Sequence, residues 1–71
     1  MDADKKKLEE LIAPMDIPEG NRDLSSFRNV MWLNRNMFIR NGSHPNFDEA
    51  SIVLKRVVRR EMAKLEDNHE G

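Results

Sequence analysis

The chain contains no cysteine, so it has neither a disulfide framework nor the thiolates of a structural zinc site. It also lacks the run of about 18 apolar residues that a membrane-spanning helix requires. Its start, MDADKKKLEE, is charged and has no apolar stretch of a signal peptide. Met1 heads the chain and no tag is evident. We therefore expect a complete small gene product that is soluble and cytoplasmic and does not bind membranes.

Glycine and proline are also scarce, with three of each in 71 residues, and they separate long stretches that suit helices. A chain this short buries only about 60% of the surface that its unfolded form exposes, so its core is small. We expect one domain over residues 1–71, with a flexible tail at 66–71. Such a core leaves little room for a pocket that would hold a small-molecule substrate.

Three segments have the apolar spacing of amphipathic helices, and none is typical of a strand. The first covers about 3–13 and is stopped by Pro14, the second covers about 23–40, and the third covers about 47–65. We predict an all-α fold, a small three-helix domain whose two longer helices are antiparallel. A strand at 36–40 is the alternative, but it would have no pairing partner.

Local signals set the ends of the two longer helices. Asp23 suits the N-cap of the second helix, and Asn41-Gly42 suits a left-handed C-terminal cap. Asn46 and Glu49 fit a capping box at the start of the third helix. Two prolines and a glycine prevent segment 14–22 from being helical. Because it also holds two apolar residues, we expect an ordered crossing loop with Met15 and Ile17 packed down.

Apolar residues occupy most of the circumference of the second helix, which is typical of a helix that has a core face and a partner face. At 100° per residue, one stripe forms the predicted core face, and two further residues widen it. The third helix has a single clean apolar stripe. The core stripe of the second helix contains Leu24, Phe27, Met31 and Phe38, widened by Val30 and Met37, and that of the third contains Phe47, Ala50, Val53, Leu54, Val57, Val58 and Leu65.

The predicted partner-binding face of the second helix contains Arg28, Trp32, Arg35 and Ile39. The two arginines are one heptad apart with Trp32 between them, and Trp and Arg are enriched at interface hot spots. We therefore expect a non-catalytic protein–protein interaction module, a regulator, adaptor or inhibitor. Its partner is another protein or a second copy of the chain in a homodimer.

In the structural alternative, Trp32 is half-buried in the core, and Arg28 and Arg35 form ion pairs within the molecule. They would then pair with Glu61, Glu9 or Glu10 from neighbouring helices. Arg-Asn pairs also repeat along this helix, at 28–29, 35–36 and 40–41, although Asn disfavours helix formation. The asparagines serve either specific contacts or a merely polar rim.

The middle of the chain is basic although the total charge is near neutral. Between Arg22 and Arg60 there are eight basic residues and three acidic ones. One face of the third helix could therefore contact nucleic-acid phosphates without sequence specificity. The alternative is a solvated helix face. The residues of this basic face are Lys55, Arg56, Arg59 and Arg60.

The sequence has no pattern that indicates catalysis, a cofactor or a metal. His44 and Asp48 are four apart, but a catalytic zinc site needs three protein ligands. Ser43 beside His44 is not an activated nucleophile, because adjacency in a turn does not bring the hydroxyl to the imidazole. We therefore expect no metal, no cofactor and no enzymatic activity.

Overall fold

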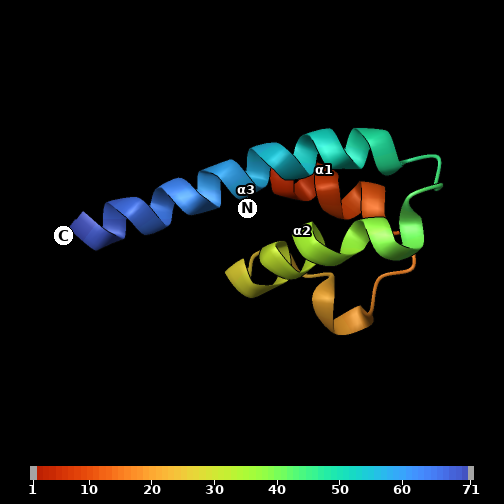
Figure 1. Cartoon of the computed structure of the whole chain (residues 1–71), viewed down its shortest axis with the longest axis horizontal. Helices are drawn as coiled ribbons and strands as arrows, with labels where there is room; N and C mark the ends of the chain where they lie inside the picture. Colours follow the sequence, from red (N-terminus) through yellow and green to blue (C-terminus); the bar gives the residue numbers. More distant parts are fainter. Residues whose placement is uncertain (1, 71) are drawn as a thin grey trace.

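The computed structural model describes residues 2–70, and the side chains of residues 2–67. It contains helices α1 (Ala3–Ile12), α2 (Phe27–Asn41) and α3 (Phe47–Glu70), with a 3-10 turn, η1 (Glu19–Asn21), between α1 and α2. No strand occurs within residues 2–70, so the predicted all-α three-helix fold is confirmed and segment 36–40 is helical. The molecule is elongated, 41 × 21 × 20 Å (Figure 1).

Both shorter helices run in the direction opposite to α3 and pack against it (Figure 1). At one end of α1, Asp4 pairs with Arg56 of α3, and at the other end Asn46 donates to the carbonyl of Leu11 at 2.9 Å. A short turn joins α2 to α3, which gives the predicted antiparallel pair. Since α1 and α2 run the same way, the connection at 13–26 has to cross the molecule, as expected.

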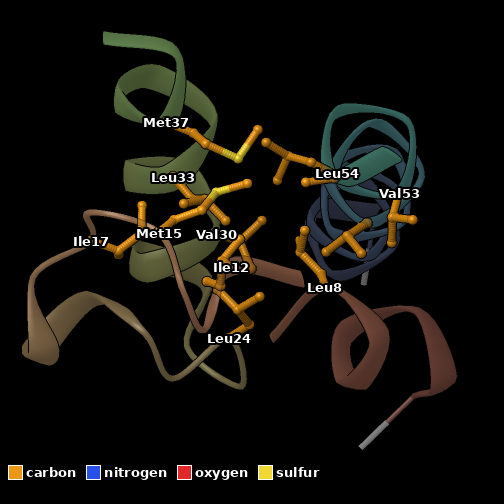
Figure 2. Close-up of a cluster of buried hydrophobic side chains, with 12 residues drawn as sticks. Leu8, Ile12, Met15, Ile17, Leu24, Val30, Leu33, Met37, Val53 and Leu54 are labelled. Atoms are coloured by element: carbon orange, nitrogen blue, oxygen red, sulfur yellow. The ribbon is translucent and has the colours of Figure 1, made fainter. Parts of the chain in front are cut away.

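The core lies between the three helices and the crossing loop (Figure 2). The loop contributes Met15 and Ile17, which are buried as predicted. Among residues 2–67, the twelve buried apolar residues are Leu8 and Ile12 of α1, Met15, Ile17 and Leu24 of the connection, Val30, Leu33 and Met37 of α2, and Ala50, Val53, Leu54 and Val57 of α3.

Of the residues predicted for the core face of α2, Leu24, Val30 and Met37 are buried, but the two phenylalanines are not. The helix buries Val30, Leu33 and Met37, whereas Phe38 is 70% exposed and Phe27 is also exposed. The side chains of the crossing loop lie against the buried face (Figure 2). Because α2 is apolar on most sides, its own periodicity could not show which side the loop would cover.

Two of the predicted signals at the ends of α2 are also wrong. The N-cap is Ser26, whose side chain accepts from the N–H of Asn29, and the helix begins at Phe27. Asp23 instead accepts from the N–H and hydroxyl of Ser25, at 3.0 and 2.7 Å. Gly42 has a right-handed backbone with φ −57°, not the left-handed one. A Cβ there would lie 3.2 Å from the carbonyl oxygen of Phe38 and 3.3 Å from its ring, a tight fit that a side chain at this position would have to relieve by a small shift.

The start of α3 is at the predicted residue, but the capping-box side chains have other partners. Asn46 donates to α1, and Glu49 pairs with Lys7 at 3.1 Å. The backbone of α3 stays helical as far as Glu70, beyond the predicted end at 65. The predicted flexible tail at 66–71 extends past the described residues, and its flexibility stays a prediction.

Candidate binding surfaces

Four residues of α2 form what we call the Trp32 face: Arg28, Trp32, Arg35 and Ile39. Their spacing of four, three and four residues places them along one side of the helix. Both arginines are exposed, and Ile39 is 71% exposed. Trp32 is half-buried and packs against the edge of the core. The core therefore holds one side of the indole in place, while another part of the ring faces solvent.

The crossing loop completes this surface with residues that sequence reasoning missed. Trp32 and Ile39 line a hollow of about 170 Å³ together with Asp16 and Pro18 of the loop. Asn36 and Arg40 of α2 form the rest of its wall. No local sequence signal could have identified Asp16 and Pro18, because only the path of the folded loop brings them close to Trp32.

The loop is fixed beside α2 by a buried amide. The side chain of Asn41 accepts from the N–H of Asp16 at 2.8 Å and donates to its carbonyl at 3.2 Å. Arg40 also faces the Asp16 carboxylate, at 3.6 Å. At the loop's other end, Arg22 donates to three carbonyls, those of Ile12, Ala13 and Met15, at 2.8 to 3.1 Å. The bonds to Ile12 and Ala13 lie at the end of α1, where helix carbonyls lack partners within the helix, and the bond to Met15 holds the first part of the loop.

The asparagines of α2 serve specific contacts within the fold. Asn29 is buried and donates to the carbonyl of Asp23 at 2.9 Å, while its oxygen accepts from Asn21. Asn36 donates to the carbonyl of Trp32 at 2.8 Å. Asn34 is exposed. Three of the four asparagines within α2, Asn29, Asn36 and Asn41, thus donate hydrogen bonds to backbone carbonyls. Only Asn34 fits the alternative of a merely polar rim.

The carboxylates named as alternative partners of the two arginines are engaged elsewhere or remain apart. Glu61 is buried and pairs with Lys5, and it also meets Lys64 at 3.3 Å. Hydrogen bonding to Lys5 holds the pKa of Glu61 below its ordinary value. Glu9 accepts from the N–H of Leu24 at 2.9 Å. Within residues 2–67, neither Arg28 nor Arg35 forms an ion pair.

The predicted basic face of α3 divides into two halves. Arg56 and Arg60 pair with Asp4 of α1, and Arg60 also lies 3.7 Å from Asp2. The guanidinium of Arg56 holds the pKa of Asp4 below its ordinary value, and the carboxylate raises the pKa of Arg56. Because Arg56 and Arg60 already pair with carboxylates of the same chain, this half of the basic face is less available to bind phosphates.

The other half of the basic face borders an uncovered part of the structure. Lys55 and Arg59 have no carboxylate partner in the part of the chain whose side chains are described. They line a hollow of about 470 Å³ at the side of α3. The remaining residues of that hollow are Asn34, Val58, Met62, Ala63 and Glu66.

The two residues that the sequence raised for metal binding, His44 and Asp48, lie in the turn before α3 and in the first turn of α3. His44 accepts from the N–H of Asn46 at its Nδ1, at 3.0 Å, so one imidazole nitrogen is used within the turn. Among the described residues, no group of three or more His, Asp or Glu side chains is placed to hold a metal ion.

In the same residues, no helix combines the length and apolarity needed to cross a membrane.

No protein-family model, curated protein or solved structure matches this chain.

Proposed function

We propose that the protein is a small, non-catalytic helical interaction module, a regulator, adaptor or inhibitor, that binds another protein through the Trp32 face. One observation carries the proposal: a half-buried indole stands between two exposed arginines that have no carboxylate partner among the described side chains. A fixed aromatic ring needs little ordering when it binds, and unpaired guanidinium groups bind carboxylates well.

The chemistry of the face indicates the partner. The hollow between Trp32 and Pro18 can take one apolar side chain, and the exposed Ile39 extends the apolar surface beside it. Arg28 and Arg35, on the same side of α2 as Trp32, then favour acidic residues next to that anchor. The expected ligand is therefore an acidic protein segment with an apolar anchor residue.

Fluorescence of Trp32, the only tryptophan in the chain, tests this proposal directly. We would titrate the protein with synthetic peptides that flank a Leu or Phe anchor with Asp and Glu, and with matched peptides that carry Lys instead. We expect the acidic peptides to change the emission and to protect Trp32 from a soluble quencher. The lysine peptides should not.

Charge-reversal variants give the control. Replacing both arginines, R28E with R35E, should raise the dissociation constant by at least about tenfold, which corresponds to 1.4 kcal/mol. Lys6→Glu changes a lysine that is exposed on α1 and should leave the constant unchanged. If no acidic peptide affects Trp32, or if the double variant binds equally well, the proposal is overturned.

Nucleic-acid binding through the basic face is the second candidate, because Lys55 and Arg59 have no described carboxylate partner. With only these two cations available, the slope of log affinity against log salt should be about −2, whereas all four would give about −4. Lys55→Glu and Arg59→Glu should abolish binding to a generic duplex. Unchanged binding in these variants would leave the basic face as solvated surface.

A further inference from the structure

Helix α3 is much longer than the helices that cover it. It has 24 residues, about 36 Å at 1.5 Å per residue, whereas α2 has 15, about 22 Å. Its C-terminal end projects past α1 and α2 (Figure 1). We call residues 62–70 the α3 overhang. All of its described side chains, those of residues 62–67, are exposed.

The overhang carries the exposed end of an apolar stripe on α3. Val58, Met62 and Leu65 are spaced by four and three residues, the spacing of a two-helix coiled coil. Val58 is half-buried beside α2, while Met62 and Leu65 are each 46% exposed. The large hollow beside Val58 and Met62 adjoins this stripe. The sequence placed Leu65 in the core, but α2 does not reach far enough to cover it.

The charges beside this stripe are self-complementary. Arg59 lies just before Met62 and Glu66 just after it, on the same side of the stripe, and both line the hollow. Neither forms an ion pair with a described side chain. Two parallel α3 helices would place the charged sides of the two copies on opposite sides of the apolar seam, so Arg59 would not reach the Glu66 of the other copy. Two antiparallel helices would bring each Arg59 to the Glu66 of the other copy.

We infer that the protein pairs with a second copy of itself through the C-terminal halves of two antiparallel α3 helices, with Met62 at the two-fold axis. Each Val58 then faces the Leu65 of the other copy, and Leu65 enters the hollow beside α2. Each Arg59 meets a Glu66 on both sides of the axis. This interface leaves the Trp32 face free, so the inference goes beyond the proposed function and is independent of it.

Sedimentation equilibrium of the full chain tests the pairing. The contact covers less than two heptads, so we expect a dissociation constant on the order of 10 μM, measured between about 1 and 500 μM. The mass should rise with concentration from 8.3 kDa toward twice that value. Leu65→Glu should hold the mass at one chain. A wild-type mass of one chain at every concentration would overturn the inference.

Charge exchange tests the antiparallel geometry. Arg59→Glu and Glu66→Arg should each weaken the homodimer, because each places like charges together twice. An equimolar mixture of these two variants should form a heterodimer tighter than either homodimer, since both contacts become Glu against Arg. The double variant should dimerise as the wild type does. A mixture without a heterodimer would contradict the geometry.

Two controls distinguish this interface from partial unfolding and from self-association through α2. The exchanged residues are exposed, so the thermal melts of the variants should match the wild type at low concentration. The Trp32-face variant R28E with R35E should keep the wild-type dimerisation. A dimer that this variant abolishes and Leu65→Glu leaves intact would place self-association on α2 and overturn the inference.

Discussion

Asn41 and Asp16 are 25 residues apart, yet the amide of one makes two hydrogen bonds with the backbone of the other. The amide oxygen accepts from the N–H of Asp16, and the amide nitrogen donates to its carbonyl. The Asn41 residue is only 4% exposed. This contact holds the crossing loop against the end of α2 and so fixes one wall of the hollow beside Trp32.

Asn41→Ala should therefore lower the free energy of unfolding by about 2 kcal/mol, because it leaves two polar backbone groups without their partner. Urea unfolding followed by circular dichroism measures the loss. Asn34→Ala removes an exposed amide of the same helix and should cost less than about 0.5 kcal/mol. Equal stability of the two variants would show that the loop does not depend on the amide.

The buried ion pair between Lys5 and Glu61 gives a second prediction. Its side chains are 10% and 8% exposed, so Lys5→Met leaves a largely buried carboxylate and should cost about 3 kcal/mol. The double variant Lys5→Met with Glu61→Leu should recover most of that loss. The exposed pair of Lys7 and Glu49 is the control, and its removal should cost under about 1 kcal/mol. An unrecovered loss in the double variant would contradict the ion-pair assignment.

Acid should destabilise the fold in a defined range. The pKa values of Asp4 and Glu61 are held below their ordinary values of 3.8 and 4.5, by Arg56 and Lys5 respectively. Carboxyl groups with a lowered pKa stabilise the fold above the unfolded pKa, and this contribution disappears as pH falls through the folded pKa. Stability should therefore fall as pH decreases below about 4.5.

The measurement is urea unfolding at several pH values between neutral and acid. Glu61→Gln removes one of the titrating groups, so its stability should fall less steeply than that of the wild type in the acid range. Parallel curves for the two proteins would show that Glu61 does not contribute to the acid sensitivity.

Core packing on α3 is tested by two matched substitutions. Val57 is 1% exposed, and Val57→Asp would bury an unpaired charge at a cost of about 4 kcal/mol or more, enough to unfold a small domain. Ile52 is an apolar residue of the same helix that is 58% exposed, and Ile52→Asp should be tolerated. Cooperative melting of Val57→Asp would refute the packing of α3 against its neighbours.

The elements of the fold could be predicted from the sequence because their signals are local. Pro14 stops the first helix, and the apolar residues of α3 lie mainly on one face of that helix. The N-cap of α2 was predicted at Asp23, but that carboxylate accepts from the N–H and hydroxyl of Ser25, and Ser26 caps the helix instead. Leu33 was missed as a core residue because the loop that covers it comes from elsewhere in the chain.

The candidate site was predictable to a smaller extent. The Trp32 face follows from helical spacing, but its hollow also needs Asp16 and Pro18, whose position depends on the whole path of the loop. Likewise, the neutralisation of Arg56 by Asp4 depends on the direction in which α1 runs, and these residues are 52 apart. Contacts over such separations leave no periodic pattern in a single sequence.

The shared direction of α1 and α2 has a consequence for the order of folding. The pair of α2 and α3 forms across a short turn, which costs little loop-closure entropy, whereas α1 docks on α3 through residues that lie 35 to 52 positions apart in the chain. We therefore expect the α2–α3 pair to form first, with α1 and the crossing loop closing over it afterwards. In the native state, the amides of α1 should then exchange with solvent hydrogen through local opening, before those of the covered part of α3.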